Sequence, residues 1–123
     1  MAGQITVDSI KASSGVLATQ NGMTGIAKAW VNYNSTARTI TNSFNVSSVT
    51  YNSAGDFTIN FTTAMPNANY AACGMTGINA WMQYQWNGSG GTAPTTTSLR
   101  VGTEAYNTSY YDTAVNSVIV FGN

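Results

Sequence analysis

The chain has 123 residues and a mass of 12.9 kDa, a length that predicts one domain with a single hydrophobic core. Only 7% of the residues are charged and the formal net charge is zero, while Ser, Thr and Asn supply more than a third of the chain. Four basic residues cannot neutralise a run of phosphates and no apolar run spans a bilayer, which argues against nucleic-acid binding and against membrane insertion.

Residues 1–25 predict an N-terminal arm outside the core. Small residues dominate this segment, and its few apolar residues include Ile5, Val7 and Ile10. Such a segment cannot build a core alone, so we expect it to pack on partner chains or to wind with them about a symmetry axis. It also lacks the apolar centre of a signal peptide, which predicts synthesis in the cytoplasm.

Residues 28–33 predict the first strand of the domain, with apolar side chains on both faces. Ala29, Val31 and Tyr33 alternate onto one face, and Trp30 lies on the other. An apolar second face in a small antiparallel fold requires a covering layer, which a neighbouring subunit can supply. Trp30 is therefore a candidate for an oligomer interface, with an exposed ligand platform as the alternative.

Residues 44–51 and 57–61 predict a β-hairpin. The second segment alternates strictly between apolar and small polar residues, as a half-buried antiparallel strand does. In the first segment the apolar phase shifts between Val46 and Val49, which predicts a β-bulge. The link at residues 52–56 has the Asn, Gly and Asp of a hairpin loop.

Residues 70–75 and 80–86 predict two further strands. We expect the single cysteine, Cys73, to be a small buried hydrophobe in the first of them. The alternation of the second puts aromatic residues on both faces, because Trp81 is out of phase with Trp86. One aromatic must then leave the core, so Trp81 is a second oligomer-interface candidate.

Two polar loops flank a predicted strand at residues 98–102, and a last strand is predicted at 115–121. The loop at 87–94 is rich in Gly, and the loop at 103–113 carries three tyrosines among short polar residues. Rigid aromatics in such a setting resemble adaptable recognition loops, although packing of the loop on itself is an equal alternative for the tyrosines. The candidate receptor-binding residues are Asn87, Tyr106, Asn107, Tyr110, Tyr111 and Asp112.

These elements predict an all-β fold: an antiparallel β-sandwich or small barrel, jelly-roll-like, at residues 26–123 and preceded by the arm. No window shows a helical apolar stripe, and helix-favouring residues are scarce.

Four segments between residues 28 and 75 carry a resemblance to a known family: Lys28 to Asn34, Ser43 to Thr50, Gly55 to Phe61 and Met65 to Tyr70. Together they resemble the distal, receptor-binding module of tailed-bacteriophage tail fibre proteins. The stretch Ile5 to Ile10 is similar to the repetitive strand that precedes this module in such fibres. The resemblance implies a homotrimer, a location in the virion and attachment to a host surface glycan or protein, with the arm contacting other virion proteins.

The residue types in the chain give little support for enzyme activity. The chain contains no histidine, which removes the usual triads and the commonest metal ligand. Glu104 and Asp112 could meet across the Tyr106 loop as a glycosidase-like pair or, with Asn107, surround a calcium ion. No regular acidic spacing supports the ion, and a solvated loop explains these residues better. We therefore expect no enzyme activity, no cofactor and no metal.

The sequence thus predicts a structural head module of a phage appendage that forms a homotrimer and contacts a host receptor. Two alternatives stay open: a monomeric carbohydrate-binding module, and a capsid or tail decoration protein without a ligand.

Overall fold

The computed structural model describes residue 3 and residues 25–77, 80–84, 91–106 and 109–122. These residues form eight strands and, in these ranges, no helix. The strands are β1 (Ala27–Asn34), β2 (Thr39–Phe44), β3 (Val46–Ser53), β4 (Asp56–Phe61), β5 (Ala71–Thr76), β6 (Ala80–Tyr84), β7 (Ser98–Ala105) and β8 (Asn116–Phe121). The predicted all-β class is confirmed.

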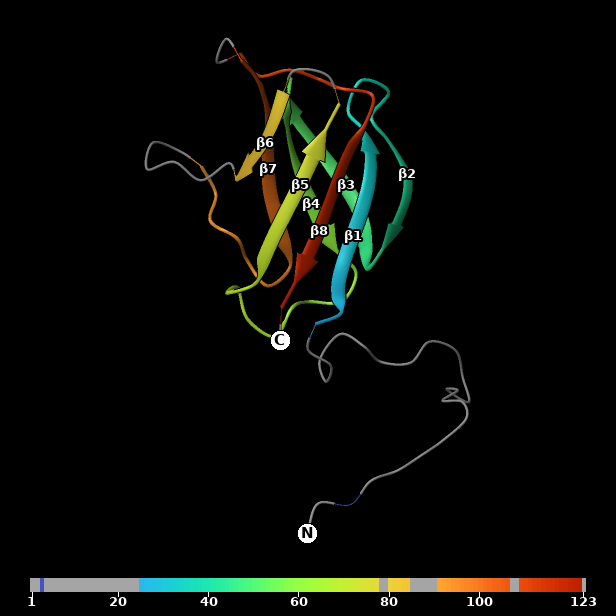
Figure 1. Ribbon diagram of the computed structural model, residues 1–123, viewed down its shortest axis with the longest axis vertical. Helices are drawn as coiled ribbons and strands as arrows, with labels where there is room; N and C mark the ends of the chain where they lie inside the picture. Colours follow the sequence, from blue (N-terminus) through green and yellow to red (C-terminus); the bar gives the residue numbers. More distant parts are fainter. Residues whose placement is uncertain (1–2, 4–24, 78–79, 85–90, 107–108, 123) are drawn as a thin grey trace.

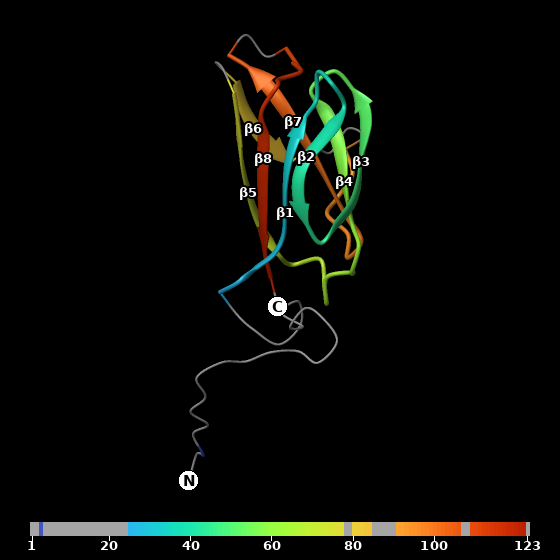
Figure 2. The same cartoon turned by 90° about the vertical axis from the view of Figure 1, so that its right-hand side faces the viewer.

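The strands form two four-stranded antiparallel sheets that pack face to face. One sheet has the order β2-β1-β8-β5 and the other the order β3-β4-β7-β6. Figures 1 and 2 show the two layers from two directions at right angles. The fold is therefore a β-sandwich, with strands that alternate between inward and outward residues.

The core lies between the sheets and comes mainly from the four central strands. Its buried apolar residues are Ala29, Val31, Tyr33, Phe57, Ile59, Phe61, Met65, Tyr70, Leu99, Val101, Val118 and Val120. Tyr33 packs on Phe57 with ring centroids 5.1 Å apart, and Phe61 meets Tyr70 edge to face at 5.8 Å. The predicted inward face of β1 is thus confirmed.

The predicted hairpin at residues 44–61 is confirmed as the β3 and β4 pair, and its register shifts between Val46 and Ser48 as the bulge requires. The prediction was wrong at its start, because the strand does not continue through Asn45. Asn45 has a positive φ of 54° and separates β2 from β3. Its side chain accepts a hydrogen bond from Thr63 N at 2.7 Å and donates one to Lys28 O at 2.9 Å.

The sandwich has two distinct ends. The ends of β1, β3, β5 and β7 lie at one end, here called the tip. The start of β1, the end of β8 and the connections after β2 and β4 lie at the opposite end, the base (Figure 1). The predicted arm at residues 1–25 lies outside the described residues except for Gly3 and Gly25.

Candidate interaction surfaces

The three loop tyrosines are exposed at the tip. Tyr106 is 78% exposed, Tyr110 43% and Tyr111 50%. Their loop follows β7, whereas the Gly-rich loop precedes β7 in the chain and lies outside the described residues at positions 87–90. Asn87 and Asn107 lie outside the described residues.

Asp112 ties the tip loop to the β3–β4 hairpin. Its carboxylate oxygens accept hydrogen bonds from Gly55 N and from the Tyr51 hydroxyl, each at 2.8 Å. The hydrogen bond to Asp112 is the main reason that the pKa of Tyr51 is raised. The Arg38 guanidinium lies 4.0 Å from the centroid of the Tyr51 ring. Asp112, predicted to contact a receptor, therefore has a clear role within the fold.

A buried network of hydrogen bonds joins this loop to the ends of β1 and β5. Asn116 Nδ2 donates to Tyr33 O, Ser35 Oγ and Thr113 O at 3.1 to 3.2 Å. Asn116 Oδ1 accepts from the hydroxyls of Thr76 and Thr113 at 2.9 and 2.8 Å. Ser35 N in turn donates to Thr113 O. The end of β1, the end of β5 and the tip loop are thus fixed to one another.

The hydroxyl of Tyr33 is buried without a hydrogen-bond partner among the described residues. Burial is the largest cause that raises the pKa of Tyr33, and the Asp112 carboxylate raises it further. The phenol therefore stays neutral at physiological pH.

Two adjoining hollows open at the tip. The first has a volume of about 250 Å³ and is lined by Thr36, Gly77, Tyr111, Asp112, Thr113, Ala114 and Val115. The second has a volume of about 240 Å³ and is lined by Asn32, Tyr33, Thr41, Ala114, Val115, Asn116 and Ser117. Ala114 and Val115 are common to both, so the two hollows share one wall.

The outer face of the β2-β1-β8-β5 sheet carries an apolar row across all four strands. The register places Trp30 opposite both Phe44 and Ile119, and Ile119 opposite Cys73. Residues directly opposite in an antiparallel pair share a face, so these four side chains form one line, here called the apolar row. The only charged residue in the four strands is Lys28, which is fully buried.

The prediction for Cys73 was wrong, because the thiol is exposed on this outer face. Strand β5 has small or apolar residues in both phases, so its sequence did not indicate which phase points inward. Ile119 is 39% exposed in the row, and Phe121, in the same phase of β8, is 43% exposed.

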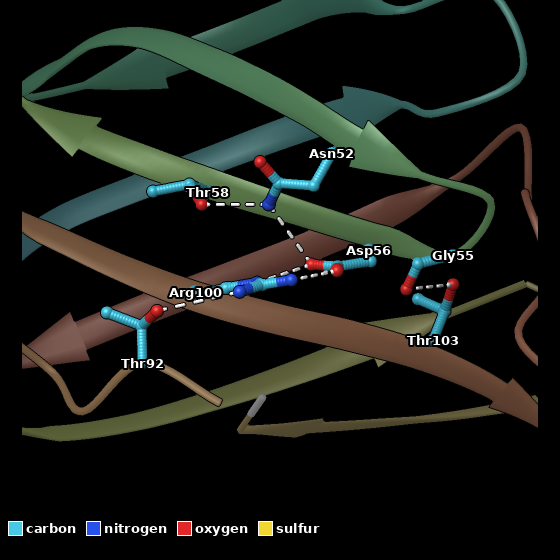
Figure 3. A network of polar contacts seen from close by, with 7 residues as sticks. All are labelled: Asn52, Gly55, Asp56, Thr58, Thr92, Arg100 and Thr103. Atoms are coloured by element: carbon cyan, nitrogen blue, oxygen red, sulfur yellow. Dashed lines mark hydrogen bonds and ion pairs between the residues drawn. The ribbon is translucent and has the colours of Figure 1, made fainter. Parts of the chain in front are cut away.

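The outer face of the β3-β4-β7-β6 sheet is polar instead (Figure 3). Arg100 Nε donates to Asp56 Oδ1 at 2.9 Å, and Asn52 Nδ2 joins the same oxygen to Thr58 Oγ1. Trp81 lies on this face beside its register partner Glu104 and is 46% exposed. Trp30 and Trp81, both predicted for an oligomer interface, therefore occupy opposite outer faces.

The ion pair between Arg100 and Asp56 makes a pH-dependent contribution to stability. Burial raises the pKa of Asp56, but the hydrogen bonds from Arg100 and Asn52 and the charge of Arg100 outweigh it, so the net shift is downward. A carboxyl group with a lowered folded-state pKa stabilises the fold above its unfolded pKa, and this stabilisation is lost as the pH falls through the folded-state value.

Arg100→Ala is expected to lower the free energy of unfolding by about 2 kcal/mol near neutral pH, because Asp56 loses charged hydrogen bonds. The difference from the wild type should shrink as the pH falls below 3.8, the ordinary Asp value. Urea unfolding between pH 7 and pH 3 measures it. Arg38→Ala, at an exposed site, is the control and should cost about 0.5 kcal/mol or less. A pH-independent difference would contradict this account.

The two carboxylates considered for catalysis have separate partners. Glu104 accepts a hydrogen bond from Gln83 Nε2 at 2.8 Å on the polar outer face. Asp112 binds the hairpin at the tip. Within the described ranges, no three His, Cys, Asp or Glu side chains gather as metal ligands would. In the same part of the chain there is no helix that could cross a membrane.

Comparisons of the chain with protein-family models, with curated proteins and with solved structures found no match.

Several surface residues were not identified from the sequence. The hollows depend on Thr36, Asn32 and Thr41, polar residues in a chain where such residues are everywhere, so no signal distinguishes them. Ile119 could have been found, because residues 118–121 are apolar in both phases, as in the two-sided pattern around Trp30.

Proposed function

We propose that this protein is the head module of a bacteriophage fibre or similar virion appendage, that it forms a homotrimer, and that its tip contacts the host surface. The observation that carries the proposal is the apolar row on one outer face only. An uncharged apolar row is suited to burial against a second copy, because no like charges repel when identical rows meet. The opposite face, with its paired charges and amides, is suited to solvent.

The placement of the two ends supports the same proposal. The chain enters β1 at the base, where the arm would join the rest of an appendage. The exposed tyrosines lie at the far end, where a host surface would be met. A trimer joined through the apolar rows presents three tips together, so that weak single contacts add by avidity.

Size-exclusion chromatography with light scattering of the whole chain tests the assembly. We expect a mass of three times 12.9 kDa for the wild type. Ile119→Asp places a charge in the apolar row and should shift the protein to monomer, while Trp81→Ser, on the opposite face, should leave the trimer intact. A monomeric wild type would contradict the proposal and favour the carbohydrate-binding alternative.

Cys73 provides a second readout. Its thiol is exposed in the single chain, so a maleimide should label the Ile119→Asp monomer quickly and the assembled wild type slowly. Equal labelling rates would show that the apolar row is not the contact. Immunogold labelling of intact particles with an antibody against this chain tests the virion location, and absence of label from any appendage would overturn it.

A further inference from the structure

We propose that the two hollows at the tip are adjoining subsites for consecutive units of a neutral oligosaccharide. The inference rests on the proposed function only in taking the tip as the host-facing end. Each hollow, at about 250 and 240 Å³, lies below the roughly 300 to 1,000 Å³ of pockets that enclose a drug-sized ligand. Each therefore suits one ring-sized unit, and the shared wall sets the two units side by side.

The first hollow offers a stacking surface. Tyr111 is half exposed and Val115 is 60% exposed, so both present apolar area to a ligand. The C–H face of a sugar ring packs on such surfaces, while the phenol hydroxyl can still form hydrogen bonds. Thr36 adds a hydroxyl to the same hollow.

The second hollow offers hydrogen-bonding groups. Ser117 Oγ donates to Asn32 Oδ1 at 2.8 Å, which fixes the orientation of the amide. Asn32 Nδ2 has no partner among the described residues and is left to donate to a ligand. Thr41 adds a hydroxyl that can donate or accept. An amide held in place beside hydroxyls matches the alternating donors and acceptors of a sugar.

The charges around the hollows favour an uncharged ligand. Among the described residues, neither hollow is lined by Lys or Arg, so a phosphate or a sugar carboxylate finds no cation there to pair with. Asp112 is the one acidic residue in the lining, and its oxygens already accept from Gly55 N and Tyr51 Oη. Its remaining negative charge disfavours anions.

The size and rigidity of the site favour a glycan over a protein partner. A specific protein interface buries roughly 800 Å² on each partner, mostly around a hydrophobic centre, whereas the tip offers two small polar-aromatic depressions. Thr113 lines the first hollow and Asn116 the second, and the two side chains belong to one buried hydrogen-bond network, so binding does not have to order this part of the lining first.

Isothermal titration of the whole chain with disaccharides tests the inference. The probes are maltose, lactose and diacetylchitobiose, with sialyllactose as the anionic counterpart of lactose. We expect millimolar binding of at least one neutral disaccharide and weaker binding once sialic acid is added. No binding of any neutral probe at tens of millimolar would overturn the inference, as would a preference for sialyllactose over lactose.

Matched variants locate the site. Tyr111→Ala should weaken binding about ten-fold and Tyr111→Phe should restore most of it. Tyr106→Ala is the control, because Tyr106 is more exposed yet lines neither hollow. Asn32→Ala should weaken the disaccharide while leaving the corresponding monosaccharide unchanged. Equal losses for Tyr106→Ala and Tyr111→Ala would contradict the assignment.

These outcomes are separable from those for the proposed function. A monomer that binds a neutral disaccharide would support the two subsites and contradict the trimer. A trimer that is found on virions but binds no probe would support the appendage module and contradict the subsites.

Discussion

Gly55→Ala is expected to lower the free energy of unfolding by about 3 kcal/mol, because two separate penalties fall on one position. Gly55 has a positive φ of 65°, which a residue with a Cβ adopts only with strain. A Cβ here would also overlap with Tyr111 N and Thr103 O, both backbone atoms. The β3–β4 hairpin and the tip loop would have to separate. Urea or thermal unfolding measures the loss.

Gly77→Ala is the matched control for this prediction. It lies at the same end of the sandwich, and an added Cβ would meet Val115 Cβ at an ordinary 3.7 Å. We expect a change within about 0.5 kcal/mol. If Gly55→Ala were as stable as Gly77→Ala, the close approach of hairpin and loop would not exist in solution.

Asn116→Ala should cost about 3 kcal/mol, since it removes hydrogen bonds from several buried groups at once. Tyr33 O, Thr113 O and the Thr76 hydroxyl each lose a hydrogen bond to this one side chain. The tip loop should also loosen. Hydrogen exchange at Ser35 N, which donates to Thr113 O, should become faster than the global loss of stability explains.

Asn60→Ala provides the comparison, because its amide also donates to two side chains but on the exposed outer face. Those acceptors, Ser48 Oγ and Thr50 Oγ1, can turn to water instead. A loss below about 1 kcal/mol is expected. Similar losses of stability for Asn60→Ala and Asn116→Ala would mean that burial does not determine how much these hydrogen bonds stabilise the fold.

Much of the sandwich could be predicted because apolar residues at every second position identify the face of a strand that packs against the core. Strand β4 and the inward face of β1 follow from their apolar phase alone. Strand β2 was missed because it lies at the edge of its sheet and its residues Thr39–Asn42 are exposed, so no buried phase marks it. The break at Asn45 depends on a backbone conformation and on hydrogen bonds to residues 17 and 18 positions away.

The candidate sites were less predictable for a related reason. That Tyr110 and Tyr111 lie on an exposed loop follows from local composition. That Asp112 binds the hairpin 57 residues earlier, and that Ala114 and Val115 separate two hollows, depends on how distant segments meet. The sequences of β5 and β8 have apolar residues in both phases, so they also do not show which face of the strand packs against the core.

The position of β8 has a consequence for how the protein is made. This strand lies between β1 and β5, so the last of the eight described strands completes a sheet whose other members were synthesised long before it. Until residues 116–121 leave the ribosome, β1 and β5 each lack a neighbour and expose a free edge. A ribosome that stalls before β8 would therefore release a chain prone to aggregation, and association of copies has to wait until β8 has been made.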